Sequence, residues 1–181
     1  MKKYTLLFLY SVYFSIFSFG QGIYKSADDF RNNIYYLSST NGEKVKINSG
    51  NIFKENIVNV KVGNKKIQLN KSEYYGFRDE KNRVFRFYEN QTYHLLNPTE
   101  KIFIYRKKVL GGPKGNLTTY KYYFSLTPES NLVELTTFNL KTIYKSNPTL
   151  LEKIDLHFKN DVELAEFDSF TNKFKLNNVL N

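Results

Sequence analysis

The chain has 181 residues, with 27 Lys and Arg against 17 Asp and Glu, 16 Phe, 15 Tyr and no Cys. A hydrophobic content of 41% excludes a disordered chain, and this length buries a core that needs no disulfide or metal for stability. The absence of Cys also excludes thiol nucleophiles, sulfur-bound metals and a lipoprotein anchor, which is attached through a thiol.

The first twenty residues read as a targeting segment. Lys2 and Lys3 precede an uncharged, mostly apolar stretch over residues 5–19, and Ser18-Phe19-Gly20 supplies small residues at a cleavage position. We therefore predict a signal peptide over residues 1–20, an exported protein and a mature chain that begins at Gln21. An uncleaved anchor is the alternative, but a span requires about 20 apolar residues. No later segment is apolar enough to cross a membrane.

A short helix is predicted over residues 26–33. Ser26 stands three residues before Asp29, the spacing of a reciprocal capping box, and Phe30 supplies an apolar side chain for the core. Asp28 and Asp29 are therefore expected to interact with the helix dipole rather than to act as catalysts.

Residues 43–127 change to a period of two, which predicts strands. Turn-forming residues interrupt the pattern about every ten residues, as in an antiparallel meander of six to eight strands. Gly63-Asn64 is predicted to form a two-residue hairpin turn with positive φ at both positions. Gly76 has no side chain to pack, so it is predicted to mark a bulge or a close backbone approach.

Residues 136–180 are predicted to be mainly helical. Thr136 or Thr137 begins a first helix that ends near Asn147, because Pro148 disfavours helical geometry in its predecessor. Pro148 then fits the first turn of a second helix. The pattern after residue 161 fits both helical turns and a short strand. Residues 21–181 are thus expected to form a single α+β domain, with a curved or partly closed antiparallel sheet, a short N-terminal helix and a C-terminal helical segment packed on the sheet.

Several short motifs resemble uncharacterised exported proteins of Bacteroidota bacteria, a group to which no activity is assigned. The motifs are Gly22-Ile23-Tyr24-Lys25-Ser26 near the start, Tyr75-Gly76-Phe77-Arg78-Asp79 in the centre, and Glu163-Leu164 with Phe167-Asp168 near the end. The resemblance covers most of residues 21–181. It implies an exported protein in the periplasm, at the cell surface or secreted, and it implies no site.

The positive charge is concentrated in the middle of the chain. Residues 43–128 carry 17 basic and 7 acidic residues, and residues 101–128 carry no acidic residue. Because an exported protein is not expected to meet nucleic acid, this charge favours an anionic glycan, a lipid headgroup or an acidic protein surface as partner. Arg106, Lys107 and Lys108 are the candidate contacts. The alternatives are that the charge serves solubility and that this hairpin is a solvated, edge-protecting projection.

Tyrosine and arginine side chains gather in the centre of the chain. The candidate binding residues are Tyr74, Tyr75, Arg78, Arg86 and Tyr88. Aromatic rings can stack on sugar rings, and guanidinium groups bind carboxylate or phosphate, which predicts a glycan or headgroup platform. Alternation along a strand sends some of these side chains inward, so the alternative is a core with a solvated rim.

The sequence offers little for catalysis, and we predict no metal site and no cofactor. With two His and no Cys, a three-histidine zinc site cannot form. His94 is a candidate general base beside Arg86 or Glu89, with a structural role as the alternative. The expected function is a non-enzymatic binding or structural module of the bacterial cell envelope. The alternative is an envelope-glycan hydrolase that uses carboxylates. The candidate carboxylates are Asp161, Glu163, Glu166 and Asp168, and an acidic helix face is the other interpretation of these residues.

Overall fold

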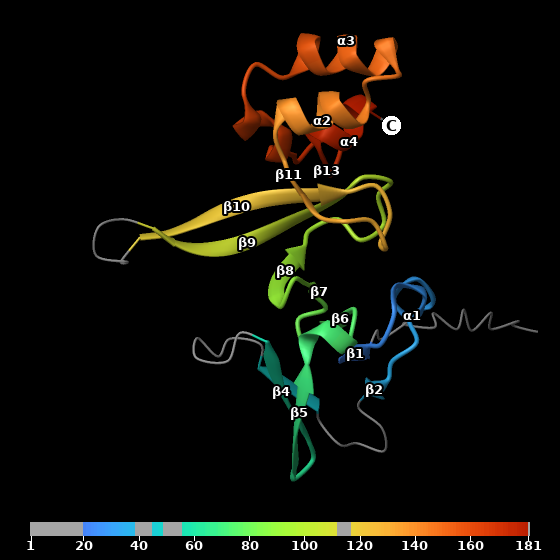
Figure 1. Cartoon of the computed structure of the whole chain (residues 1–181), viewed down its shortest axis with the longest axis vertical. Helices are drawn as coiled ribbons and strands as arrows, with labels where there is room; N and C mark the ends of the chain where they lie inside the picture. The colour runs from blue at the N-terminus through green and yellow to red at the C-terminus, as the bar shows by residue number, and fades with distance from the viewer. Residues whose placement is uncertain (1–19, 39–44, 49–55, 112–116, 181) are drawn as a thin grey trace, which may run out of the picture.

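A computed structural model describes residues 20–38, 45–48, 56–111 and 117–180. The predicted signal peptide up to Phe19 and the tip of the basic hairpin at residues 112–116 lie outside the described residues. The α+β prediction is confirmed: an open eight-stranded antiparallel sheet is accompanied by a short N-terminal helix and by C-terminal helices (Figure 1).

The eight-stranded sheet has the order β11-β10-β9-β8-β7-β6-β1-β2. Its strands are β1 (Gly22–Tyr24), β2 (Leu37–Ser38), β6 (Gly76–Arg78), β7 (Val84–Tyr88), β8 (Gln91–Leu95), β9 (Phe103–Gly111), β10 (Leu117–Ser125) and β11 (Val133–Glu134). Strands β6 to β10 belong to the predicted meander, and β11 continues it. Strands β1, β2 and β11 lie outside the predicted range of residues 43–127, because the N-terminal segment and the chain after β10 extend the sheet at its two edges.

Three strands inside the predicted range form a separate antiparallel sheet. They are β3 (Val45–Asn48), β4 (Ile57–Val62) and β5 (Lys65–Asn70), followed by the 3-10 turn η1 (Lys71–Glu73). The β4–β5 hairpin has the predicted two-residue turn, in which Val62 pairs with Lys65. Gly63 has a φ of 55°, whereas Asn64 is not among the residues with positive φ. The prediction of a positive φ at Asn64 was therefore wrong. This turn requires a positive φ only at its first central position, which Gly63 occupies.

Gly76 confirms the predicted close backbone approach. A Cβ atom at this position would lie 2.0 Å from the carbonyl oxygen of Phe85 on the neighbouring strand. Because that oxygen belongs to the backbone of β7, no side-chain rotation relieves the clash. Position 76 therefore requires glycine because the backbone of β7 lies too close for a side chain. Its φ is not in the left-handed region.

The helix α1 (Ala27–Asn32) begins as its sequence predicts. The Ser26 hydroxyl accepts a hydrogen bond from the backbone N–H of Asp29 at 3.1 Å, and the Asp29 carboxylate accepts one from the Ser26 N–H at 2.9 Å. The helix ends at Asn33, whose φ of 53° is left-handed. The predicted capping box is confirmed in both of its hydrogen bonds.

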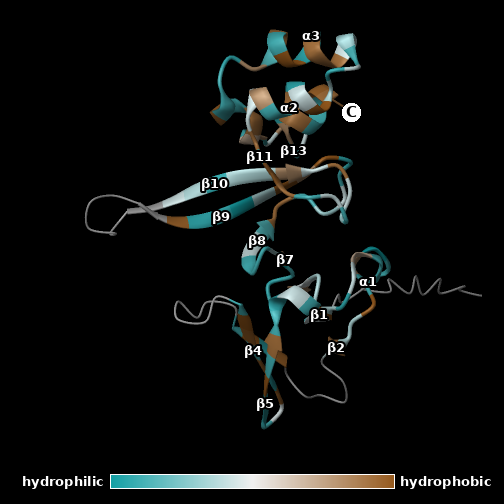
Figure 2. Ribbon diagram, in the orientation of Figure 1, coloured by the Kyte–Doolittle hydropathy of each residue, from teal (hydrophilic) through white to brown (hydrophobic). Residues whose placement is uncertain are grey.

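The C-terminal segment combines helices with a small hairpin. It contains α2 (Thr137–Ile143), α3 (Pro148–His157), the 3-10 turn η2 (Asp161–Ala165), β12 (Phe167–Asp168), β13 (Lys173–Phe174) and α4 (Lys175–Leu180). Thr136 caps α2, and Asn147 caps α3 with Pro148 in its first turn. Helix α2 ends four residues before the predicted Asn147, and Asn147 serves the next helix instead. Figure 2 shows both hydropathy colours on α2 and α3, as expected for helices with one buried side.

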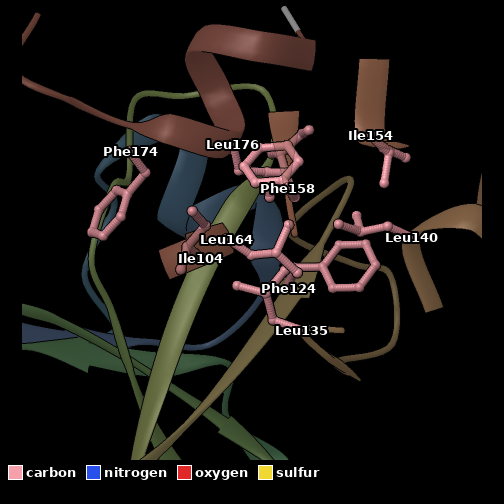
Figure 3. Close-up of a cluster of buried hydrophobic side chains, with 10 residues drawn as sticks. Ile104, Phe124, Leu135, Leu140, Ile154, Phe158, Leu164, Phe174 and Leu176 are labelled. Carbon is pink, nitrogen blue, oxygen red and sulfur yellow. The ribbon is translucent and has the colours of Figure 1, made fainter. Parts of the chain in front are cut away.

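Three groups of buried side chains hold these parts together. The C-terminal helices pack on one face of β9 and β10, where Ile104 and Phe124 from the sheet meet Leu140, Ile154 and Leu176 (Figure 3). A second group joins the three-stranded sheet to β1, β6 and β7 through Val58, Val60, Ile23, Phe77 and Phe87. A third lies on the opposite face of the large sheet beside α1, and includes Tyr24, Phe30, Tyr75, Tyr93 and Tyr105. Both faces of the central strands are thus covered.

Candidate functional site

Strand alternation divides the predicted aromatic and basic cluster between two faces. Tyr74 belongs to the core of the three-stranded sheet. The Lys25 ammonium group lies over the Tyr74 ring, 4.2 Å from the ring centroid. Tyr75 points to the other face and stacks on Phe30 at 5.2 Å. Tyr74, Tyr75, Arg78 and Arg86 are each at most 9% exposed, so they do not form an open platform. Their positions match the alternative of a core.

Arg78 connects α1 to the turn between β6 and β7. Its Nε donates to the hydroxyl of Tyr24 at 2.9 Å, Nη1 donates to Oδ1 of Asn82 at 2.9 Å, and Nη2 donates to Oδ1 of Asn33 at 3.2 Å. Asn33 and Asn82 both have positive φ, a conformation that asparagine tolerates better than most residues. The two turns therefore place their amide oxygens around one guanidinium group.

An open cavity of about 690 Å³ lies beside Arg78. Helix α1, the β6–β7 turn, the loop after β8 and the loop after β10 form its walls. The lining residues are Phe30, Arg31, Asn33, Arg78, Asn82, Pro98, Thr99, Glu100, Lys101, Phe103, Leu126, Thr127 and Pro128. The volume lies within the range of small-molecule sites, and aromatic and aliphatic side chains accompany the polar groups, as is usual in such sites.

The cavity lining is positively charged on balance, with three basic residues and one acidic residue. Arg31 forms ion pairs with Asp28 at 2.8 Å and Glu129 at 2.5 Å. Glu100 lies 3.6 Å from the ammonium group of Lys173. Lys101 is exposed and forms no ion pair with any described residue. The cavity therefore offers a cation to an anionic ligand.

Sequence reasoning identified only Arg78 among these lining residues as a candidate contact. Lys101 belongs to the acid-free stretch noted in the sequence, but nothing in that pattern places it beside Arg31 and Phe30. The cavity joins four segments that are distant in the chain, so no local spacing reveals it.

The three basic residues of β9 alternate between the two faces of the β9–β10 hairpin. The Arg106 guanidinium lies 4.9 Å from the ring centroid of Tyr120, and its Nε donates to Nδ1 of His94 at 3.2 Å. Lys107 lies over Tyr93 on the other face, 5.7 Å from the ring centroid. Lys108 is exposed. Arg106, Lys107 and Lys108 therefore share a projection but not one face.

His94 does not meet its predicted partners. It stacks on Phe85 at 4.9 Å on the face opposite Arg86, and Glu89 is an exposed residue of the β7–β8 turn. Burial, followed by the positive charges of Arg106 and Arg83, lowers the pKa of His94 to about 4. The neutral imidazole accepts the hydrogen bond from Arg106, so the structural role is the one the geometry supports.

A second open cavity, of about 470 Å³, lies between β10 and η2. Its lining includes Tyr120 and Tyr122 with the carboxylates of Glu134, Asp161 and Glu166. Each carboxylate has a partner: Asp161 accepts from the backbone N–H of Thr137 at 2.7 Å, Glu134 lies 3.4 Å from Lys121, and Glu166 lies 3.7 Å from Lys175.

The carboxyl groups with shifted pKa values resemble ion-pair and capping groups rather than general acids. Hydrogen bonds from the Lys159 backbone and the Lys175 ammonium lower the pKa of Glu163, and hydrogen bonds from Thr171 and Phe170 lower that of Asp168. Hydrogen bonds and the charge of Arg31 lower the pKa of Glu129 against the effect of burial. A general acid in a glycosidase requires the opposite shift.

Comparison of the chain with protein-family models, curated proteins and solved structures finds no match in any of the three. Within the described residues, no helix combines the length and apolar character of a membrane span. The same residues contain no group of three His, Asp or Glu side chains arranged to hold a metal ion. The candidate site therefore rests on its own geometry and charge.

Proposed function

We propose that this chain is an exported, non-enzymatic binding module of the bacterial cell envelope, and that its cavity beside α1 takes an anionic ligand. The cavity of about 690 Å³, with Arg31, Arg78 and Lys101 in its wall, is the observation that carries the proposal. A concave site of this size favours a small acidic group, such as a uronic acid of a glycan or a phosphorylated headgroup, over a flat acidic protein surface. Phe103, which is half-buried in the cavity wall, supplies aromatic surface for a sugar ring.

Binding of acidic oligosaccharides tests this proposal. Oligogalacturonate is the acidic probe, and neutral dextran fragments of equal length are the control ligand. We expect binding of oligogalacturonate alone, which weakens as salt screens charges over a Debye length of about 8 Å. Phosphorylated headgroups, presented as short-chain phosphatidic acid, form a separate arm that distinguishes the two sources of negative charge.

Charge reversal at Lys101 locates the site. Lys101→Glu should weaken binding about tenfold, because it converts attraction into repulsion at an exposed position. Lys66→Glu, on exposed β5 outside the cavity, makes the same change in net charge and should leave the affinity within about twofold. Equal losses in the two variants, or no binding of either acidic probe by the wild type, would contradict the proposal.

The cavity between β10 and η2 supports the hydrolase as a second candidate. Three carboxylates and two tyrosines line it, and glycoside hydrolysis uses a pair of carboxyl groups on opposite sides of the scissile bond. Incubation with purified peptidoglycan and measurement of new reducing ends tests this activity. Release that is lost in Glu166→Gln would establish the hydrolase, and absence of release from the wild type would remove it.

A further inference from the structure

Arg86 lies inside a group of three tyrosine rings on the α1 side of the large sheet. The side chain is 5% exposed, and its guanidinium carbon lies 5.4 Å from the ring centroid of Tyr75, 5.5 Å from that of Tyr88 and 5.8 Å from that of Tyr105. We call these three rings the tyrosine cage. The loop after β10 reaches the cage, because the carbonyl oxygen of Ser130 accepts a hydrogen bond from Arg86 Nη2 at 2.9 Å.

The remaining donors of Arg86 are unused. Nε and Nη1 are buried and have no hydrogen-bond partner among the described residues, and the same is true of the hydroxyl of Tyr75. No carboxylate forms an ion pair with Arg86 in the described part of the chain. Glu129, whose charge acts on Tyr75, is itself bound by Arg31. Within the described residues, this buried positive charge thus has no negative partner.

This arrangement is costly unless an acceptor completes it. The tyrosine faces attract the cation, but they do not replace acceptors for N–H groups that point outward in the guanidinium plane. Burial raises the pKa of Tyr75, so its hydroxyl remains protonated and able to donate. A water molecule would bring two donors of its own to a place already rich in donors, whereas an anion only accepts.

We infer that Arg86 and Tyr75 bind a small monovalent anion, a halide or a carboxylate, within the tyrosine cage. Arg86 supplies the charge and two N–H donors, and the hydroxyl of Tyr75 supplies a third. The site is separate from the cavity beside α1, whose lining includes none of the residues of the cage. Its occupation stabilises the contact between the large sheet and the loop after β10.

Thermal unfolding in exchanged salts tests the anion site. The full chain is unfolded at pH 7 and constant ionic strength while sodium gluconate, which has a bulky anion and serves as the reference salt, is replaced by chloride, bromide or acetate. A ligand at 100 times its dissociation constant raises the Tm by roughly 5–10 °C in a chain of this length. Chloride and acetate arms distinguish the halide from the carboxylate.

Two variants and one direct observation localise the effect. Tyr75→Phe removes one donor and keeps the ring, so half of the Tm rise should require about tenfold more anion. Tyr120→Phe, at a half-exposed ring of the hairpin, should behave as the wild type. Crystals soaked in bromide should show anomalous scattering within hydrogen-bond distance of Arg86 Nε or Nη1. Equal Tm values in all salts, an unchanged Tyr75→Phe response or a water molecule at that position would overturn the inference.

Discussion

Two buried arginines on the same face of the sheet are stabilised in different ways. Arg78 donates to a phenol and to two asparagine side chains, so its hydrogen bonds come from turns whose conformations depend on those asparagines. Arg86 relies on aromatic rings and a single backbone carbonyl group. Removing one partner of a buried charge lowers the free energy of unfolding more than removing an exposed ion pair. The charge that remains is then buried with neither a partner nor solvent to stabilise it. These two positions are therefore poor choices for variants meant to test binding alone.

His94 gives the protein a stability that depends on pH. Its pKa is about 4 in the folded protein and 6.5 as the ordinary value, so the unfolded chain binds more protons between these limits. The contribution of His94 to the free energy of unfolding should therefore be complete above pH 6.5 and should fall as the pH decreases to 4. The loss should be less than about 3 kcal/mol, because solvent screens this half-buried ring. Urea unfolding at several pH values measures this change.

Comparison of histidine variants separates His94 from the carboxyl groups that titrate at lower pH. His94→Gln keeps an acceptor for Arg106 and removes the titration, so its unfolding free energy should depend less on pH between 6.5 and 4. His157→Gln changes the exposed histidine at the end of α3 and should retain the wild-type slope. A His94→Gln slope equal to that of the wild type would show that His94 does not titrate abnormally.

At the level of elements, the β4–β5 hairpin depends on the backbone of Gly63. A φ of 55° is accessible to glycine and is strained for a β-branched residue. Gly63→Val should lower the free energy of unfolding by about 1–2 kcal/mol or more. Gly63→Asn is the matched control, because asparagine tolerates positive φ, and it should lose less. Equal losses in urea unfolding of the two variants would contradict backbone strain as the cause.

The elements that sequence predicted well are governed by neighbouring residues. Ser26 with Asp29 determines the start of α1, Pro148 determines the start of α3, and Gly63 determines the β4–β5 turn. Strand pairing depends on distant residues and was predicted less well. The period of two in residues 45–70 predicts strands correctly but does not say that they form their own sheet, and no local signal pairs β1 with β6.

The candidate site was predictable only in part for the same reason. Alternation predicts only that some side chains of the aromatic and basic cluster point inward, and it does not say which ones. Burial of Arg78 and Arg86 was not foreseen, because arginine is rarely buried and its partners come from other elements. Four segments that are distant in the sequence form the cavity beside α1. Only the complete fold brings them together.

At the scale of the whole molecule, the β9–β10 hairpin extends away from the rest of the sheet (Figure 1). Among its described residues, Lys108 and Lys121 are exposed cations, and Arg106 and Lys107 are half-buried. If this projection docks on anionic envelope material, replacing Arg106, Lys107 and Lys108 by Gln should weaken retention on purified outer-membrane vesicles at low salt. High salt should weaken retention of the wild type. The free energy of unfolding should fall by about 1 kcal/mol, because the variant loses the hydrogen bond from Arg106 to His94, so retention is compared for folded protein.

A second triple variant separates location from net charge. Replacing Lys61, Lys65 and Lys66 by Gln removes three exposed charges from β4 and β5, away from the β9–β10 hairpin. Retention of this variant should match the wild type. Equal weakening of the two triple variants would assign the effect to overall charge, and equal retention of all three proteins would leave solubility as the role of the charge.

The place of β1 in the sheet also affects the order in which the chain folds. Strands β6 to β11 pair with their sequence neighbours, so their hairpins close over short loops. Strand β1 pairs with β6, and the contact between Tyr24 and Arg78 joins residues 54 positions apart. Strand β1 has a local partner in β2, whereas its pairing with β6 on the other edge requires the chain between them to close a longer loop. Closing this loop costs more conformational entropy than closing the short hairpin loops, so we expect the β1–β6 pairing to form after the local hairpins of β6 to β11.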